Sequence, residues 1–173
     1  VSCHVSWGQN RKYGVWNAYN RVPITLQAGD STASWTYNVA TIRASNNTPS
    51  SYSGASFNVG SGTSCNGLTV LCGLAQETIS ANFLQQFNPN ASSGNNLAQI
   101  GIGLNSTGAF SAASKMNNNG SNLVVDFPPA LYILAPSLGL NVLAELESSN
   151  ATNANVYQGG SSQIMNLQAT WRG

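Results

Sequence analysis

Runs in which apolar and polar residues alternate recur along the chain, and this period of two restricts the fold more than any other feature. The closing run places four apolar residues on one face, namely Met165, Leu167, Ala169 and Trp171, while its other face is mostly polar. Successive side chains of a β-strand point to opposite faces, so this pattern predicts a half-buried strand. Such a strand must pack against a sheet of its own chain or against another chain.

Further runs with strand signals, such as alternation in residues 34–43 and β-branched residues in 21–27, predict a series of short strands. They cover residues 21–27, 34–43, 55–60, 122–127, 130–136, 140–147, 153–158 and the closing run after Gly159-Gly160. In the second half the turns between them are short and carry Pro128-Pro129, Pro136 and Gly139. Strands at this spacing are typical of a sandwich or a barrel. We predict an all-β fold, an immunoglobulin-like antiparallel β-sandwich.

One stretch departs from the period of two. In residues 74–87, Leu74, Ile79, Phe83 and Phe87 fall near one face of a helix. We therefore predict one short helix there, ended by Asn88-Pro89. Residues 108–116 are expected to form either a short helix or an irregular strand. Neither an internal repeat nor a long linker divides the chain, so residues 1–173 are predicted to form a single domain.

Charged residues make up only 6% of the chain, and its formal net charge is +1. Nucleic-acid binding and attraction to anionic membranes both need basic surfaces, so we expect neither. No apolar run reaches the roughly 18 residues needed for a transmembrane segment. The N-terminus lacks the basic-then-apolar layout of a signal peptide, so if the protein is exported we expect this sequence to be its mature form. Abundant Ser, Thr, Asn, Gln and Gly favour a secreted, surface, filament or virion protein.

The three cysteines favour an oxidising compartment. Cys65 and Cys72 are close in sequence, with Asn66-Gly67 between them, and we predict that they form a disulfide. Cys3 would then be free or paired with another chain. The alternative pairing joins Cys3 to Cys65 or to Cys72 and leaves the other cysteine unpaired.

Residues that could carry catalysis or hold a metal are scarce. His4 is the only histidine, and the chain has no GxSxG elbow and no phosphate-binding loop. Glu145 and Glu147 are two residues apart, so on a strand they would face the same side and could bind a cation or act as a glycosidase pair. We favour the interpretation that they lie on a solvated strand face. The chain is predicted not to be an enzyme and to hold neither metal nor cofactor.

Aromatic side chains alternate with amides and guanidinium groups near the N-terminus. The candidate ligand-binding residues of this segment are Trp7, Asn10, Arg11, Tyr13, Trp16 and Tyr19. Aromatic faces can stack on the C–H faces of a neutral sugar while amide and guanidinium groups bond its hydroxyls. The alternative is that Trp7 and Trp16 are core anchors of an N-terminal strand, because large aromatic residues are mostly buried.

The C-terminal part of the chain contains the run "FPPALYILAPSLGLNVLAELE" and an alternating run after Gly160, and Cys3 lies near the N-terminus. These features resemble the tip adhesins and pilins of chaperone–usher fimbriae. The first run is similar to late strands of their lectin domains, and mature lectin domains often carry a cysteine where Cys3 stands. Arg172 stands where that family usually has an aromatic residue. The resemblance implies that the closing strand borders a groove, which a strand from another subunit fills by β-augmentation.

Together these features predict a non-enzymatic, extracellular adhesion protein at the cell surface. It would be a fimbrial adhesin or receptor-binding domain that recognises a glycan or another surface and contacts other pilus subunits by strand addition. The alternative is a structural subunit of an extracellular filament or a capsid. Binding to ice or a mineral is a weaker alternative, because no regular repeat presents a flat lattice.

Overall fold

The computed structural model describes residues 13–14, 23–30, 32–47, 67–73, 78–88, 96–118, 129–135, 137–150, 155–159 and 165–172. Within these residues the chain is almost entirely β-structure, and its only helical element is the 3-10 turn Ser45–Asn47. The prediction of an all-β, antiparallel, sandwich-like fold is confirmed. No helix in these ranges is long and apolar enough to cross a membrane.

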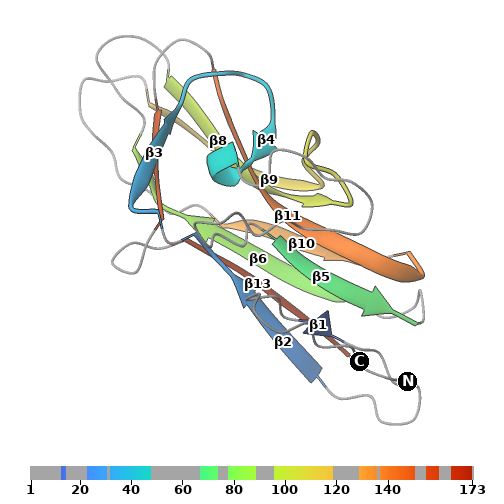
Figure 1. The fold of residues 1–173 in the computed structure, drawn as a ribbon. Helices are drawn as coiled ribbons and strands as arrows, with labels where there is room; N and C mark the ends of the chain where they lie inside the picture. The colour runs from blue at the N-terminus through green and yellow to red at the C-terminus, as the bar shows by residue number, and fades with distance from the viewer. Residues whose placement is uncertain are drawn as a thin grey trace.

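Three sheets contain the described strands (Figure 1). A six-stranded sheet has the order β1 (Tyr13–Gly14), β5 (Gly67–Cys72), β11 (Gly139–Ser149), β8 (Asn96–Leu104) and β9 (Ala112–Asn118), and β4 (Arg43–Ala44) also pairs with β11. A four-stranded sheet has the order β10 (Ala130–Leu134), β6 (Ile79–Gln85), β13 (Met165–Arg172) and β2 (Pro23–Ala28). A three-stranded sheet joins β3 (Ser34–Tyr37), β12 (Asn155–Gln158) and β7 (Phe87–Asn88). Of the described pairs, only β1 with β5 is parallel.

The main core lies between these sheets. It combines Leu68, Val70, Ile100 and Leu143 of the six-stranded sheet with Phe83, Leu167 and Trp171 of the four-stranded sheet and with Phe87 and Tyr157 of the three-stranded sheet. β10 contacts β8 and β9 across the two larger sheets. In Figure 1 β5, β6, β10, β11 and β13 run along the same diagonal, and β3 lies near its upper-left end.

The helix predicted for residues 74–87 is wrong where the structure describes it, because β6 and β7 occupy residues 79–85 and 87–88. Ile79, Phe83 and Phe87 are spaced by four, which fits one helix face but is also a multiple of two. Ala81 and Gln85, which a helix would turn away, are buried on the same side as Ile79. The strand is stabilised over the helix because β6 pairs with β10 on one side and with β13 on the other.

The other strand predictions have mixed outcomes. β2, β10, β11, β12 and β13 confirm their predicted runs, and residues 112–118 form a strand. The run 34–43 is divided into β3 and β4 by a bend, in which Tyr37 donates its O–H to the carbonyl of Thr41 at 2.7 Å. The runs 55–60 and 122–127 lie outside the described residues. β5 and β8 were not predicted.

The closing strand β13 is an interior strand. It pairs with β6 on one side and β2 on the other, and Met165, Leu167, Ala169 and Trp171 are buried on its inner face. The predicted half-buried strand is confirmed. Its pairing on both sides means that β13 does not border a groove open to an incoming strand.

Candidate functional site

Glu145 and Glu147 lie in the interior, so the solvated strand face expected for them is wrong. Both side chains are fully buried on β11, which runs between β8 and β5. They share a face, as predicted. The opposite face of β11 carries Val142, Ala144 and Leu146, which Ile42 and Phe110 cover. In a strand that is buried on both faces, polar residues do not mark a solvent-exposed face. The expectation that Glu145 and Glu147 are exposed to solvent assumed a half-exposed strand.

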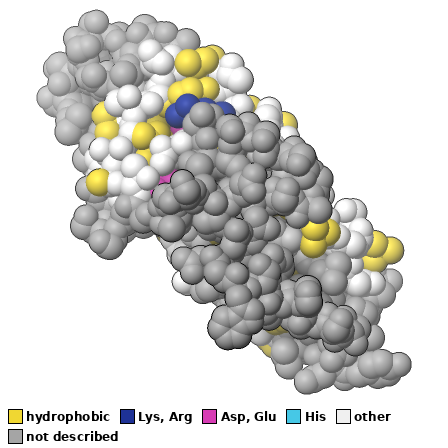
Figure 2. All heavy atoms as spheres, viewed as in Figure 1, with side chains coloured by type: hydrophobic (Ala, Val, Ile, Leu, Met, Phe, Trp, Pro, Cys, Tyr) yellow, Lys and Arg dark blue, Asp and Glu magenta, His cyan; other side chains and the backbone are white. Residues whose placement is uncertain are grey.

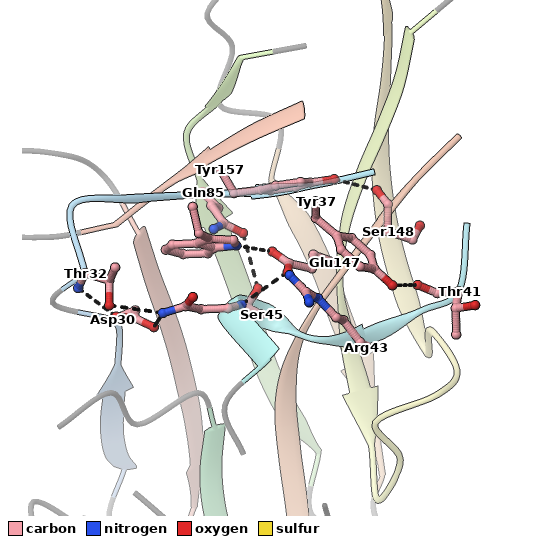
Figure 3. A network of polar contacts seen from close by, with 12 residues as sticks. Asp30, Thr32, Tyr37, Thr41, Arg43, Ser45, Gln85, Glu147, Ser148 and Tyr157 are labelled. Carbon is pink, nitrogen blue, oxygen red and sulfur yellow. Dashed lines mark hydrogen bonds and ion pairs between the residues drawn. The ribbon is translucent and has the colours of Figure 1, made fainter. Parts of the chain in front are cut away.

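Glu147 is the centre of a dense polar network (Figure 3). Arg43 donates from Nε to Oε1 at 2.8 Å, and its Nη2 lies 2.6 Å from the same oxygen. Trp35 donates from Nε1 to Oε2 at 2.6 Å, and the backbone N–H of Asn46 donates to Oε1 at 3.2 Å. Burial raises the pKa of Glu147 to about 7, although Trp35, Arg43 and Asn46 act in the opposite direction.

Asn46 connects this centre to a second buried carboxylate, Asp30. Its left-handed backbone, with φ of 57°, brings its own N–H to Glu147. Its Nδ2 donates to Asp30 Oδ2 and to Thr32 Oγ1, each at 3.0 Å. Asp30 Oδ1 also accepts from the Thr32 backbone N–H at 2.7 Å. Asparagine tolerates this conformation better than most residues, so one side chain can join two carboxylates.

Aromatic rings surround the ion pair. The Arg43 guanidinium carbon lies 3.6 Å from the centroid of the Tyr37 ring, a cation–π contact. Tyr157 stacks on Trp35 with centroids 6.4 Å apart and donates its O–H to the carbonyl of Ser148. Burial raises the pKa of Tyr157 well above its ordinary value. These contacts hold the side chains of Arg43 and Trp35 in place, so the network stabilises the fold around Glu147.

Glu145 has no such partners. Neither carboxyl oxygen has a hydrogen-bond partner, and the side chain is fully buried. Burial, with the negative charge of Asp30 as a smaller cause, raises its pKa well above the ordinary range; the backbone of Leu167 opposes this without reaching hydrogen-bond geometry. The protonated, neutral carboxyl is therefore favoured. Among the described residues, no three His, Cys, Asp or Glu side chains come together as a metal site.

The predicted ligand-binding segment is mostly outside the described residues. Trp7, Asn10, Arg11, Trp16 and Tyr19 fall there, and only the backbone of Tyr13 is described, in β1 opposite Thr69. The proximity of these side chains stays a prediction.

The disulfide predicted between Cys65 and Cys72 is not formed in this structure, because Cys72 is a free thiol. Cys72 lies in β5, and its side chain is buried in the main core. Burial raises the pKa of its thiol, and the Asn141 side chain lowers it. Cys3 and Cys65 lie outside the described residues.

The outward side of the four-stranded sheet, here called the outer face, is a regular surface that sequence analysis did not identify. Strand register aligns Leu131, Asn82, Gln168 and Gln27 in one row and Ile133, Ser80, Thr170 and Thr25 in the next. Neighbours within a row lie about 4.8 Å apart, and the rows lie about 6.7 Å apart. Thr25 and Thr170 join their hydroxyls at 3.1 Å. Each row therefore begins with an aliphatic residue and continues with amides or hydroxyls.

Charge is nearly absent from the outer face. Arg172, at the end of β13, is its only charged side chain among the described residues. The side chain of Asn82 leaves one acceptor, Oδ1, shielded from solvent and without a hydrogen-bond partner. Charged side chains are also few on the face that Figure 2 shows. Among the described residues, the dark blue of Lys and Arg and the magenta of Asp and Glu occupy one small area, surrounded by white and yellow.

Comparison with known proteins adds no assignment to these surfaces. No protein-family model matches the chain, and no curated protein matches it.

Proposed function

We propose that the protein is a non-enzymatic, extracellular adhesion protein that binds an uncharged, hydroxyl-rich ligand such as a neutral glycan. The outer face carries this proposal. A neutral sugar needs directed hydrogen bonds to its hydroxyls and apolar contact with its C–H faces. Gln27 and Gln168 are exposed amides in one row, and Leu131 and Ile133 supply aliphatic contact at the end of both rows. A fimbrial adhesin or receptor-binding domain is the corresponding class of protein.

The distribution of charge supports a ligand without charge. Of the five acidic residues, Asp30, Glu145 and Glu147 are buried. Their carboxyl groups therefore do not present a charged surface to a partner. Binding through the outer face should depend on hydrogen bonds and shape, and it should change little with ionic strength.

A glycan array compared between variants tests this proposal. Gln168→Glu places a charge in the middle of the outer face, and we expect it to abolish binding to neutral glycans. Ala113→Glu is the matched control, because Ala113 is exposed on β9 of the other large sheet. Equal binding by both variants would remove the outer face from the site. If the protein binds at low salt and does not bind at high salt, the ligand is charged.

The N-terminal aromatic segment is the second candidate site for the same function. Its support comes from the sequence pattern of Trp7, Tyr13, Trp16 and Tyr19 among amides and arginines. Trp16→Ala in the same array separates the two candidates. Unchanged binding excludes Trp16 from the site, whereas loss of binding with an intact fold assigns the ligand to this segment.

A structural subunit of an extracellular filament or capsid is the alternative function. The low charge and small polar residues that suit adhesion also suit tight packing of subunits. The two functions differ in assembly. Regular polymers of the purified protein in electron micrographs favour the subunit, and discrete particles favour the adhesion protein.

A further inference from the structure

β10 is an edge strand with an apolar outer side. It pairs with β6 and with no other described strand. Ala130 and Tyr132 point into the core, whereas Leu131 and Ile133 on the outer face are 62% and 67% exposed. Leu134, at the end of the strand, is 57% exposed. Among the described residues, no second strand covers the backbone edge of β10, and large aliphatic side chains lie at the same place.

This edge lacks the features that usually prevent association. Edge strands are commonly protected by charged residues, by proline or by a bulge. The opposite edge of the same sheet, β2, begins with Pro23 and turns Thr25 and Gln27 outward. β9, an edge of the six-stranded sheet, carries exposed Lys115. In contrast, residues 129–142 contain no charged residue, and β10 itself contains no proline.

We propose that β10 pairs antiparallel with β10 of a second copy of this chain, so that two four-stranded sheets join into one eight-stranded sheet. A two-fold axis makes such an interface self-complementary, with the same residues contributed by both copies. Because β10 is uncharged, two copies can approach without like-charge repulsion. In this pair the N–H and C=O groups along the two β10 edges form hydrogen bonds with one another.

The aliphatic side chains decide between a two-fold pair and a head-to-tail pair. An axis near Tyr132 places Leu131 beside the partner's Ile133 on the outer face, where aliphatic cross-strand neighbours stabilise a sheet. A head-to-tail pair would instead add β10 to the β2 edge of the next copy. That arrangement sets Leu131 and Ile133 beside Thr25 and Gln27 and leaves the aliphatic groups against polar ones. The two-fold pair buries apolar surface on both sides and is favoured.

The same pairing would make the outer faces of two copies continuous. A ligand with repeated units could then contact both copies at once and gain from avidity. The pairing itself does not depend on the ligand proposed for the outer face. Its failure and the failure of glycan binding are separate results.

Sedimentation velocity over a concentration series tests the pairing, with Leu131→Lys and Gln27→Lys as matched variants. Both residues end the same row of the outer face, one on each edge of the sheet. We expect the wild type and Gln27→Lys to dimerise reversibly. Leu131→Lys should dimerise more than about tenfold more weakly, because each copy then sets a lysine beside an apolar residue. Circular dichroism checks the fold, and Leu131→Ser is the milder variant if lysine disturbs it.

Three results would overturn the proposal. A wild-type chain that is monomeric throughout the series would assign the β10 edge to a strand of a different protein or leave it unpaired. A dimer equally stable in Leu131→Lys would lie on another surface. A ladder of growing oligomers would show head-to-tail pairing in place of the two-fold dimer.

Discussion

Glu145 and Glu147 point into the interior from neighbouring positions on one face of β11, yet only Glu147 faces a cation. Arg43 Nη2 lies 2.6 Å from Glu147, whereas both oxygens of Glu145 lack a hydrogen-bond partner. Burial disfavours the ionised form of each carboxyl, and a nearby positive charge offsets this only for Glu147. The two residues therefore differ in how they respond to pH and to substitution.

Glu145→Gln should flatten the dependence of stability on pH. The pKa of Glu145 is raised well above its ordinary value in the folded protein, so the folded state binds this proton more tightly than the unfolded state. Its contribution to stability is complete below the unfolded pKa of about 4.3 and is lost as pH rises towards the folded pKa. Glutamine keeps the shape and removes the titration. Urea unfolding at pH 5, 7 and 8 should show a smaller fall in the free energy of unfolding than in the wild type. Equal slopes would mean that Glu145 is hydrated in solution.

Arg43→Met should destabilise the protein most at alkaline pH. The substitution leaves the buried carboxyl of Glu147 without its cation, a loss of about 3–5 kcal/mol for a broken buried pair. It also raises the folded pKa of Glu147 above about 7, so at pH 5 the carboxyl is protonated and the loss is smaller. Urea midpoints at pH 5 and 8 measure the difference. Arg172→Met, on an exposed position, is the control and should change neither midpoint.

Trp35→Phe should remove one donor to Glu147 and keep an aromatic ring against Tyr157. The lost bond joins Trp35 Nε1 to Glu147 Oε2 at 2.6 Å. An unsatisfied buried acceptor costs roughly 1–3 kcal/mol, so we expect a loss of this size at pH 8. A double-mutant cycle with Glu147→Gln isolates the bond. If the two losses simply add, the indole N–H does not stabilise the carboxylate.

The period of two was sufficient to predict the strands that bury one face. β13 alternates cleanly because it has one side in the core and one on the outer face. β6 was mistaken for a helix because Ile79, Phe83 and Phe87 satisfy both periods, and only pairing with β10 and β13 separates them. β8 escaped detection because its run contains Gly101 and Gly103, which are rare in strand interiors.

The sites were harder to predict than the strands, because they depend on register. Leu131, Asn82, Gln168 and Gln27 are distant in sequence, and only the pairing of four strands places them in one row. The spacing of Glu145 and Glu147 correctly placed them on one face. The spacing could not show that this face is buried. Both faces of β11 are covered, and the spacing of two polar residues does not reveal this. Arg43, on the short strand β4, gave no signal of its role in the sequence.

Gly101→Ala should strongly destabilise the sheet, whereas Gly108→Ala should not. A Cβ at Gly101 would lie 2.3 Å from Phe110 Cδ1 and 2.4 Å from the backbone oxygen of Ala112. Ala112 pairs with β8 and cannot move away alone, and Phe110 packs on the cluster around Val142 and Leu146. Overpacking of this kind costs about 1–3 kcal/mol.

The control glycine lies in the connection between the same two strands. A Cβ at Gly108 would meet no atom within 4 Å, and its backbone does not require glycine. Thermal unfolding should therefore give a lower Tm for Gly101→Ala and an unchanged or slightly higher Tm for Gly108→Ala, since alanine reduces the freedom of the unfolded chain. An equal Tm for both variants would contradict the close packing of Phe110 over β8. That packing covers the second face of β11, and its loss would expose the strand that carries Glu145 and Glu147.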